Sequence, residues 1–413
     1  MRLLVITQYF WPEDFRINEL VSELIRRGHE VTVLTGKPNY PDGKVFPEFV
    51  ERPDRFSTYF GAHVLRVPML SRGRGRVSLF LNYLSYALST TVFGILRLQG
   101  KQFDAIFVFE PSPITVGLPA IALRRLRRWP VAFWVLDQWP EALSAMGVVK
   151  SRVGLALAAR LVSFIYSRCD LILAPSKSLV SRIGSYCRDQ RRIVYFPNWA
   201  ESVYSDTAAV PATEIPIGVA SFTVMFAGNI GEAQDFPAIL DAAEQLKNNS
   251  DIRWIVVGDG RLTGWVKDEV NRRGLQERFI LLGRFPLHRM PSLYKHASAL
   301  LVSLKSDTIL SMMIPGKAQS YLAFGLPLIG MLDGEGARVI EEADAGLTCP
   351  AGESGILAEI VLRMAGMTER ERSAMGANGR AYAKREFDRD LLVNRLEGLL
   401  AKLSISHGKS VEA

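Results

Sequence analysis

Short apolar runs alternate with longer amphipathic stretches along most of the chain. The apolar run Leu3–Thr7 precedes a helical pattern over Asn18–Arg27, which Gly28 ends, and a second apolar run follows at Glu30–Thr35. This alternation predicts strand–helix–strand units and a parallel sheet. Further strands of the first half are predicted at Ala62–Val67, Ala105–Phe109, Val131–Leu136, Leu171–Ala174 and Ile193–Phe196.

The alternation stops at Glu201–Ser221, which is rich in Ala, Pro, Ser and Thr and typical of a linker. It then restarts. We predict an α/β protein with two doubly wound parallel-sheet domains at 1–200 and 222–385, whose strand ends face a cleft. A terminal helix at 386–413 is expected to pack back on the first domain. Strands of the second half are predicted at Phe222–Ala227, Trp254–Val257, Phe279–Leu282, Ala299–Ser303 and Leu328–Gly330.

The charge of the chain favours an anionic partner. The net charge of the 413 residues is +8, and no nucleic-acid-binding module is recognisable, which leaves membrane or phosphate as the partner. Cys169, Cys187 and Cys349 fit neither a disulfide framework nor a zinc site. The N-terminal apolar run is too short for a signal peptide. These features predict a cytoplasmic protein without nucleic-acid partners.

A helix that begins at Pro315-Gly316-Lys317 and ends before Gly325 is the strongest candidate for phosphate binding. A helix N-terminus offers unpaired backbone N–H groups and a partial positive charge, which together bind anions. Lys317 is unusual in that first turn, because cations are favoured at the other end of a helix. A bound diphosphate would explain it; the alternative is an exposed lysine on a surface helix.

Two glycine turns follow strands of the second half. Gly228-Asn229-Ile230-Gly231 follows the strand Phe222–Ala227, and Gly258-Asp259-Gly260 follows the next strand. Glycine between a strand and a helix lets the backbone approach a phosphate, although ordinary tight turns have the same composition. Both turns are expected on the same edge of the sheet.

Polar residues also follow predicted strands of the first half. Asp137, in Asp137-Gln138-Trp139-Pro140-Glu141, could orient or deprotonate an acceptor hydroxyl, or cap a helix. Arg16 follows the first strand, in a loop that also holds Glu13, and suits either phosphate recognition or a surface ion pair. The loop Gly36–Gly43, with Tyr40, could form a wall of an acceptor pocket or a rigid turn.

One uncharged stretch, Ser78–Leu96, is nearly as long as the ~20 residues that span a bilayer. Its Asn, Ser and Thr residues disfavour a span. A buried domain helix is favoured, with a helix lying on the membrane as the alternative. Basic residues flank this stretch, and others cluster at 124–128, so we predict peripheral contact with an anionic membrane.

Metal chemistry is not expected. The five histidines lack ligand spacing. Asp388-Arg389-Asp390 is expected at the start of a solvated helix rather than in a metal motif. We therefore predict that no metal or other cofactor is required.

Together these residues resemble the retaining glycosyltransferases of family 4, which have the GT-B fold of two Rossmann-like domains. The likeness is strongest to the subgroup that builds bacterial O-antigen and capsule, including fucosaminyltransferase-like members. The matching stretches are Gln8-Tyr9-Phe10-Trp11-Pro12-Glu13, Arg27-Gly28-His29-Glu30-Val31, Pro38-Asn39-Tyr40-Pro41-Asp42-Gly43, Asp137-Gln138-Trp139-Pro140-Glu141, Pro197-Asn198-Trp199, Ala227-Gly228-Asn229-Ile230-Gly231, Gly258-Asp259-Gly260 and Pro315-Gly316-Lys317 through Gly325-Leu326-Pro327.

The resemblance implies that the second domain binds a nucleotide sugar and the first an acceptor, with retention and without metal. With the patterns above, it assigns catalytic roles to Asp137 and Lys317. Acceptor-binding residues are Glu13, Arg16, Tyr40 and Trp139. Donor-binding residues are Gly228, Asn229, Gly231, Gln234, Gly258, Asp259, Arg284, Phe285, Lys305, Pro315, Gly316, Gln319, Ser320, Glu335 and Gly336.

The chain also departs from the family pattern. Met312 and Ser320 stand where the broader family has two glutamates, and Asn229 and Gln234 replace its usual Arg and Lys. We predict transfer of a sugar such as N-acetyl-fucosamine from a UDP-linked donor to an undecaprenyl-diphosphate-linked acceptor, at the inner face of the cell membrane. A UDP-sugar 2-epimerase and an inactive assembly partner are the alternatives.

Overall fold

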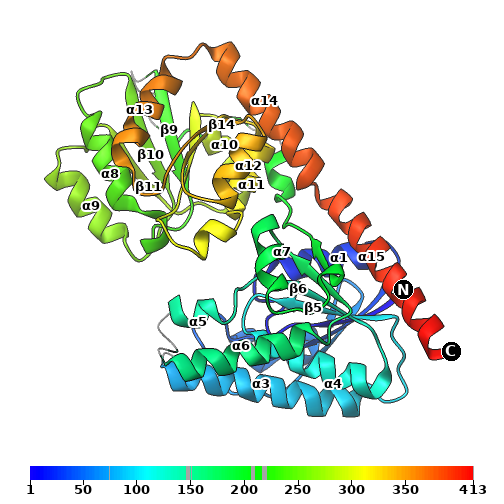
Figure 1. Ribbon diagram of the computed structural model, residues 1–413. Coiled ribbons are helices and arrows are strands. Elements are labelled where there is room, and N and C mark those ends of the chain that lie inside the picture. The colour runs from blue at the N-terminus through cyan, green and yellow to red at the C-terminus, as the bar shows by residue number, and fades with distance from the viewer. Residues whose placement is uncertain (74, 146–148, 150, 206–209, 216–220, 413) are drawn as a thin grey trace. The chain divides into compact units, whose positions relative to one another are not determined.

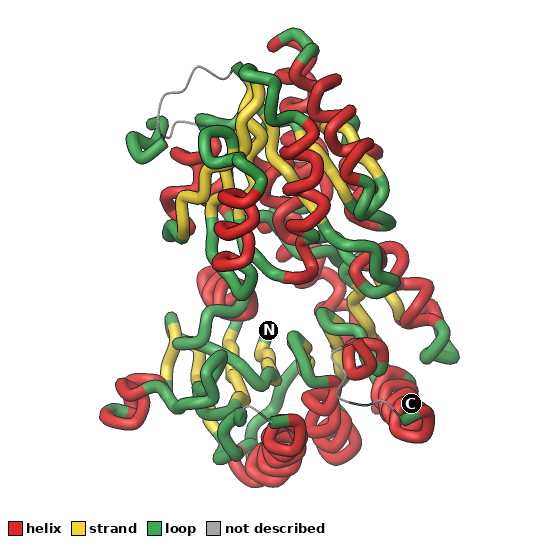
Figure 2. Tube along the Cα trace, turned by 90° about the vertical axis from the view of Figure 1, so that its left-hand side faces the viewer, coloured by secondary structure: helices red, strands yellow, loops and turns green. Residues whose placement is uncertain are grey.

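The computed structural model describes residues 1–73, 75–145, 149, 151–205, 210–215 and 221–412. The chain divides into two compact units, one formed by Met1–Phe196 with Val393–Ala413 and the other by Pro197–Leu392 (Figure 1). In each unit a sheet lies among helices (Figures 1 and 2). Both units therefore have the α/β layers that the alternating pattern predicts.

The sheet of unit 1 has the order β3-β4-β2-β1-β5-β6-β7-β8, and only the β3–β4 pair is antiparallel. At its centre, Val5 of β1 lies opposite Val33 of β2 and Phe107 of β5. The strand order reverses between β1 and β5, and ligands of such sheets bind at the strand ends beside a reversal. The strands are β1 Arg2–Ile6, β2 Glu30–Thr35, β3 Thr58–Tyr59, β4 Ala62–Arg66, β5 Ala105–Glu110, β6 Val131–Val135, β7 Leu171–Ala174 and β8 Ile193–Tyr195.

The helices of unit 1 follow the strands in sequence. Glu397 of the last helix, α15, pairs with Arg27 at 2.8 Å and with His29 at 2.5 Å. The chain thus returns to unit 1 at Val393, within this helix rather than at 386. The helices are α1 Arg16–Arg26, α2 Pro47–Glu51, α3 Arg76–Arg97, α4 Gly117–Arg127, α5 Glu141–Ala145, α6 Arg152–Tyr166, α7 Lys177–Gly184 and α15 Arg389–Glu412.

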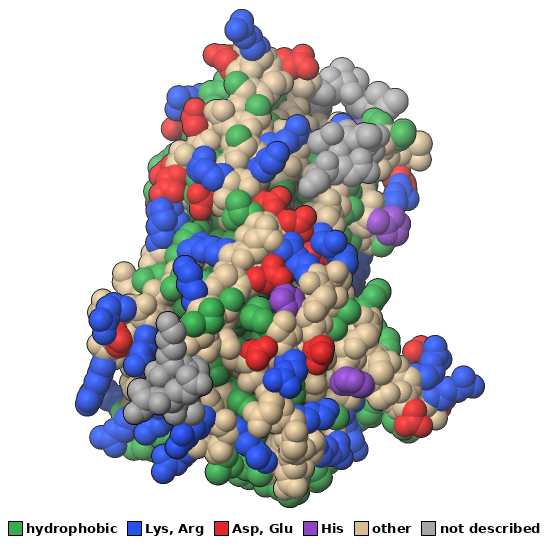
Figure 3. All heavy atoms as spheres, turned by 90° about the vertical axis from the view of Figure 1, so that its right-hand side faces the viewer, with side chains coloured by type: hydrophobic (Ala, Val, Ile, Leu, Met, Phe, Trp, Pro, Cys, Tyr) green, Lys and Arg blue, Asp and Glu red, His purple; other side chains and the backbone are tan. Residues whose placement is uncertain are grey.

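Helix α3 corrects one prediction, because only one of its sides is buried. Asn82, Tyr86 and Thr90 are buried, whereas Leu88 and Val92 are 60% and 53% exposed. By length and composition alone, Val77–Arg97 is also long and apolar enough to cross a membrane. Hydrophobic side chains lie among Lys and Arg side chains along the lower edge of unit 1 (Figure 3). The helix is therefore half-buried, rather than the buried domain helix that the sequence favoured.

The sheet of unit 2 has the order β11-β10-β9-β12-β13-β14, and its neighbouring strands pair in parallel. Its strand order reverses between β9 and β12. The strands are β9 Phe222–Ala227, β10 Ile252–Val257, β11 Phe279–Gly283, β12 Ala299–Ser303, β13 Leu328–Met331 and β14 Gly346–Cys349; the helices are α8 Phe236–Gln245, α9 Thr263–Arg272, α10 Met290–Tyr294, α11 Gly316–Phe324, α12 Glu335–Glu342, α13 Ser354–Ala365 and α14 Glu369–Glu386.

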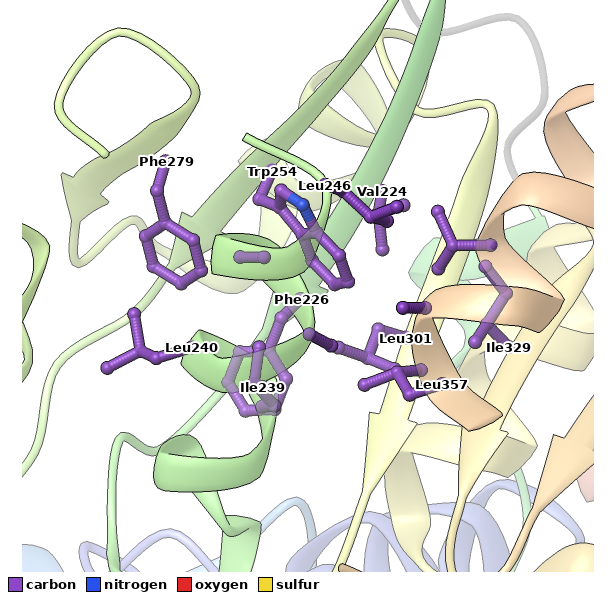
Figure 4. Packing of buried hydrophobic residues seen from close by; sticks show 14 of the residues in the cluster. Val224, Phe226, Ile239, Leu240, Leu246, Trp254, Phe279, Leu301, Ile329 and Leu357 are labelled. Atoms are coloured by element: carbon purple, nitrogen blue, oxygen red, sulfur yellow. The ribbon is translucent and has the colours of Figure 1, made fainter. Parts of the chain in front are cut away.

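Both faces of the second sheet are buried. Val224 and Phe226 of β9 pack toward Ile239 of α8 and Leu357 of α13 (Figure 4), whereas the intervening Met225 packs on the other face. Successive side chains of a strand point to opposite faces. A strand covered on both faces therefore needs a continuous apolar run, which is the pattern that the sequence displays.

The predicted linker is corrected where the structure describes it. Tyr204 stacks on Tyr294, with ring centroids 5.7 Å apart, and the Ala212 N–H donates to the Ser292 carbonyl at 3.0 Å. These residues therefore pack within unit 2. The short strands β3 and β14 were not predicted either, because neither forms a recognisable apolar run.

Candidate functional site

Two glycine turns of unit 2 meet at the ends of β9 and β10. Gly228 and Gly258 have φ angles of 140° and 142°, which favour glycine. A Cβ atom at Gly258 would lie 1.9 Å from the Gly228 carbonyl oxygen. The close approach of the turns requires glycine at position 258, and the structure brings the two turns together on one sheet edge, as predicted.

Lys317 in the first turn of α11 reaches this edge. Its Nζ lies 3.7 Å from the centroid of the Phe226 ring, and a Cβ atom at Gly228 would be 3.2 Å from it. The Nζ atom is buried, and it has no hydrogen-bond partner among the described residues. Burial disfavours the charged form and lowers the pKa of Lys317 to about 7. A buried amine without a partner is well placed to receive an anion.

The turn after β9 is held by its own side chains. The Gly231 N–H donates to Gln234 Oε1 at 3.2 Å, and Asn229 Nδ2 lies 3.4 Å from the same oxygen. The Lys305 N–H, just after β12, donates to the Ala233 carbonyl at 2.9 Å. The predicted residues Asn229, Gln234 and Lys305 therefore lie together beside the reversal of strand order.

Two predicted donor-binding residues are engaged inside unit 2. Gln319 Nε2 donates to the Asn198 carbonyl at 2.7 Å, and Ser320 Oγ donates to Glu201 Oε2 at 2.7 Å. Both side chains are buried. Glu201, more than a hundred residues away in the sequence, thus brings a carboxylate beside Ser320. Nothing in the local pattern around Glu201 indicated this.

Helices α11 and α12 begin side by side. A Cβ atom at Gly336 would lie 3.0 Å from Pro315 Cδ. Glu335 is buried and forms an ion pair with Arg338 one turn later. The carboxylate of Glu335 therefore has an internal partner at the N-terminus of α12, next to the start of α11.

The remaining predicted donor-binding residues lie at the ends of β10 and β11. The Thr263 hydroxyl donates to Asp259 Oδ1 at 2.7 Å, and this hydrogen bond lowers the pKa of Asp259. Arg284 is exposed, and its charge contributes to the same shift. Phe285 packs against the core cluster that contains Tyr294. These residues flank the glycine turns without contacting Lys317 in any described interaction.

In unit 1 the structure reveals a carboxyl group that sequence reasoning missed. Glu110, the last residue of β5, is fully buried, and its Oε2 accepts the N–H groups of Leu136 and Asp137 at 3.3 Å each. Its Oε1 has no partner among the described residues. Burial, and the nearby charge of Asp137, raise the pKa of Glu110 well above its ordinary value. Its position at a strand end was the available signal.

Asp137 shares this cluster with two hydroxyl groups. Burial raises the pKa of Asp137, and a hydrogen bond from Ser112 offsets part of the shift. Ser112 also hydrogen-bonds Tyr83. Ser112 has a φ of 126°, and such strained backbone concentrates at functional sites. Asp137 therefore lies in a buried polar cluster at the ends of β5 and β6.

Glu13 joins two loops rather than facing a pocket. Its Oε1 accepts the N–H groups of Asn39 and Tyr40 at 2.8 Å each, and its Oε2 accepts that of Phe10 at 3.1 Å. The side chain is 2% exposed, and burial raises its pKa. The predicted acceptor contact is therefore replaced by a structural role, because backbone amides already use the carboxylate.

Tyr40 belongs to an aromatic cluster, with its ring centroid 5.2 Å from that of Tyr9. The Arg72 guanidinium lies 5.4 Å from the Tyr40 ring centroid and donates to the Tyr9 hydroxyl at 3.4 Å. Arg16 is the first residue of α1, next to Phe15, which stacks on Tyr9. The structure thus groups Tyr40 with Arg72, a cation that the sequence had placed only in a basic flank.

Trp139 packs against Tyr83 of the polar cluster that contains Glu110 and Asp137. Its ring centroid is 6.4 Å from that of Tyr83, at a steep angle of 61°. Within the part of the chain that the structure describes, no group of three or more His, Cys, Asp or Glu side chains could hold a metal ion. Tyr83 thus connects Trp139 with Ser112, the hydrogen-bond partner of Asp137.

The charge state of Glu110 should be visible in stability. A carboxyl group whose pKa is raised by folding does not destabilise the fold at low pH, where it is protonated in both states. It destabilises the fold as pH rises above the pKa that the same group has in the unfolded chain. Glu110→Gln keeps the shape without the charge. We expect the free energy of unfolding of the variant, measured by urea denaturation, to exceed that of wild type by more at about pH 8 than at about pH 5. The same difference between variant and wild type at both pH values would contradict the raised pKa of Glu110.

Comparisons with known proteins agree with this architecture. Residues 15–199 match the family model "Glycosyl transferase 4-like domain", and residues 221–366 match "Glycosyl transferases group 1". Two glycosyl transferase models therefore match separate stretches of the chain, together leaving residues 1–14, 200–220 and 367–413 unmatched. The first matched stretch contains the Glu110–Asp137 cluster, and the second contains Lys317 and the glycine turns.

Two relatives have names that describe glycosyltransferases. The chain is 29% identical over 258 residues to WbjE of Pseudomonas aeruginosa, whose name describes it as a probable glycosyltransferase; the match covers 59% of this chain and 63% of that relative. It is 24% identical over 343 residues, 79% of this chain and 82% of the relative, to WcaI of Escherichia coli strain K12. That name describes it, in similarly provisional terms, as a colanic acid biosynthesis glycosyl transferase.

Solved structures show the fold. A crystal structure of HepE from Anabaena in complex with UDP superposes with a TM-score of 0.71 at 14% identity, covering 97% of this chain and 100% of that one. The two domains thus have the GT-B fold. At this identity the likeness establishes the architecture alone.

Proposed function

We propose that the protein is a glycosyltransferase of bacterial surface polysaccharide synthesis that uses a nucleotide diphosphate sugar. The observation that carries the proposal is Lys317 Nζ, buried without a described partner between Phe226 and Gly228. A buried cation is costly unless an anion neutralises it. The β-phosphate of a sugar donor would do so at the N-terminus of α11, where backbone N–H groups are also available.

The donor is proposed to be UDP-linked, with an N-acetylated amino sugar such as N-acetyl-fucosamine. Support comes from HepE, which has the same fold and whose crystal structures contain UDP or UDP-glucose. Asn229 and Gln234 hold the turn after β9 without adding charge, so Lys317 and Lys305 are the proposed cations for the diphosphate. Retention of anomeric configuration and independence of metal are part of the proposal.

The acceptor is proposed to be a sugar carried on undecaprenyl diphosphate, bound by the 4-like domain at the inner face of the cell membrane. Asp137 would orient or deprotonate the acceptor hydroxyl, for which a raised pKa is suitable. The exposed apolar side of α3 and the surrounding Lys and Arg residues would contact an anionic leaflet (Figure 3).

The first test is calorimetric titration of the protein with UDP, GDP and ADP in EDTA, followed by a transfer assay with lipid-linked acceptors. We expect one nucleotide to bind without metal and its sugar to be transferred. Epimerised donor in the absence of acceptor would instead identify an epimerase. Absence of nucleotide binding and of transfer would favour an assembly partner and overturn the proposal.

Nucleotide binding should depend on the protonation of Lys317. Because its pKa is about 7 in the free protein, the amine loses its charge above neutral pH, whereas a bound diphosphate stabilises the charged form. We expect the dissociation constant of UDP to rise by up to about tenfold per pH unit between about pH 7 and about pH 9. Titrations of Lys317→Met should lack this dependence; the same slope in the variant would exclude Lys317 as its source.

A further inference from the structure

An apolar groove runs between α3 and α6 of unit 1. It encloses a cavity of about 280 Å³, whose lining includes Phe80, Tyr83 and Leu84 of α3, Leu157 and Ala158 of α6, and Trp139. Polar atoms are nearly absent from its walls. Such a cavity suits a hydrocarbon rather than a sugar or nucleotide, because it offers almost no hydrogen-bonding groups.

The walls of the groove continue onto an exposed surface. Phe80 is 62% exposed, Leu84 39% and Leu157 58%. Single exposed apolar side chains are ordinary, but a contiguous apolar recess marks a site for a ligand or membrane. The groove is therefore open along α3 and α6 to an apolar molecule from outside.

One end of the groove reaches the polar cluster. Tyr83 and Trp139 line the cavity, and Tyr83 also hydrogen-bonds Ser112, the partner of Asp137. The charge of Arg72 acts on Tyr83 as well. Tyr83 therefore links the apolar walls both to the charge of Arg72 and, through Ser112, to Asp137.

We propose that this groove holds the first isoprene units of a polyisoprenyl diphosphate, with the diphosphate near Arg72 and the attached sugar near Asp137. The inference rests on the proposed function, because it assigns the lipid part of the same acceptor. The occupant combines a hydrocarbon chain, an anion and a sugar, and the apolar walls, Arg72 and Asp137 offer a partner for each. A flat bilayer surface would cover α3 without filling a recess beside Trp139.

The test is direct binding of geranylgeranyl diphosphate to the whole protein, measured by Trp fluorescence without any sugar donor. Ala158→Phe fills the groove, and Ala156→Phe places the same ring on the exposed side of the same helix. We expect binding to weaken at least tenfold in Ala158→Phe and to stay at the wild-type level in Ala156→Phe. Binding of both variants to vesicles with anionic lipids should match wild type.

Other results overturn the proposal. Wild-type binding in Ala158→Phe would exclude the groove as the lipid site, and parallel loss of vesicle binding would make it a general membrane contact. If Ala158→Phe does not fold, as judged by circular dichroism, Phe80→Ser on α3 and its control Val50→Ser on α2 repeat the comparison at exposed positions. The test measures lipid binding and not sugar transfer. The groove can therefore fail to bind the lipid in a protein that transfers sugar, and it can bind the lipid in a protein that does not.

Discussion

Lys317→Met should lower kcat/KM for sugar transfer by about 10²–10³-fold, the usual effect of removing one charged or hydrogen-bonding group that stabilises a developing anion. The methionine keeps most of the apolar stem that packs on Phe226 and Gly228. It also removes the cost of burying an amine without a described partner, so the free energy of unfolding should stay equal or rise. Steady-state kinetics and thermal denaturation measure the two effects.

Lys267→Met on the exposed side of α9 is the matched control, because it removes the same charge away from the sheet edge. It should leave both kinetics and stability near wild type. If Lys317→Met transfers sugar at the wild-type rate, the phosphate role of Lys317 is wrong. A loss of activity with a large loss of stability would instead mean that the amine is needed for folding.

Asp137→Asn should lower kcat by about 10²–10⁴-fold, the range that a positioned general base supplies. UDP binding should not change, because Asp137 lies in unit 1 and Lys317 in unit 2. The amide retains the shape of the side chain beside Ser112. Calorimetry with UDP and a transfer assay with lipid-linked acceptor separate the two effects.

The exposed Asp54→Asn in the same domain controls for loss of a carboxylate. The wild-type profile of kcat/KM should rise with pH as Asp137 loses its proton and fall above about pH 7 as Lys317 loses its own. Asp137→Asn should remove the rising limb only. An unchanged profile and rate would exclude Asp137 as the base.

Much of the fold was accessible from sequence, and the reason is local. Buried parallel strands need continuous apolar runs, so Glu30–Thr35, Leu171–Ala174 and Ala299–Ser303 were predicted with the bounds that the structure has. The short strands β3 and β14 were missed because partly exposed edge strands lack such runs. The linker was misjudged because composition does not report that Tyr204 stacks on Tyr294.

Site residues divide in the same way. The glycine turns and Lys317 could be placed because each sits at a strand end or a helix start, which sequence marks. Glu110 was missed although it ends β5, because the pattern does not tell that its carboxylate accepts the N–H of Asp137. Glu13 was misassigned, since only the folded loops bring the amides of Asn39 and Tyr40 to it.

The sequence by itself determined two parallel α/β domains, an excess of positive charge and a lysine at a helix N-terminus, because periodicity, composition and helix boundaries are properties of neighbouring residues. Only the tertiary structure decided that Lys317 is buried against Gly228, that Glu201 reaches Ser320 and that α3 leaves one apolar side open. These features depend on which distant strand ends and helix faces become neighbours, and that is fixed by packing between segments.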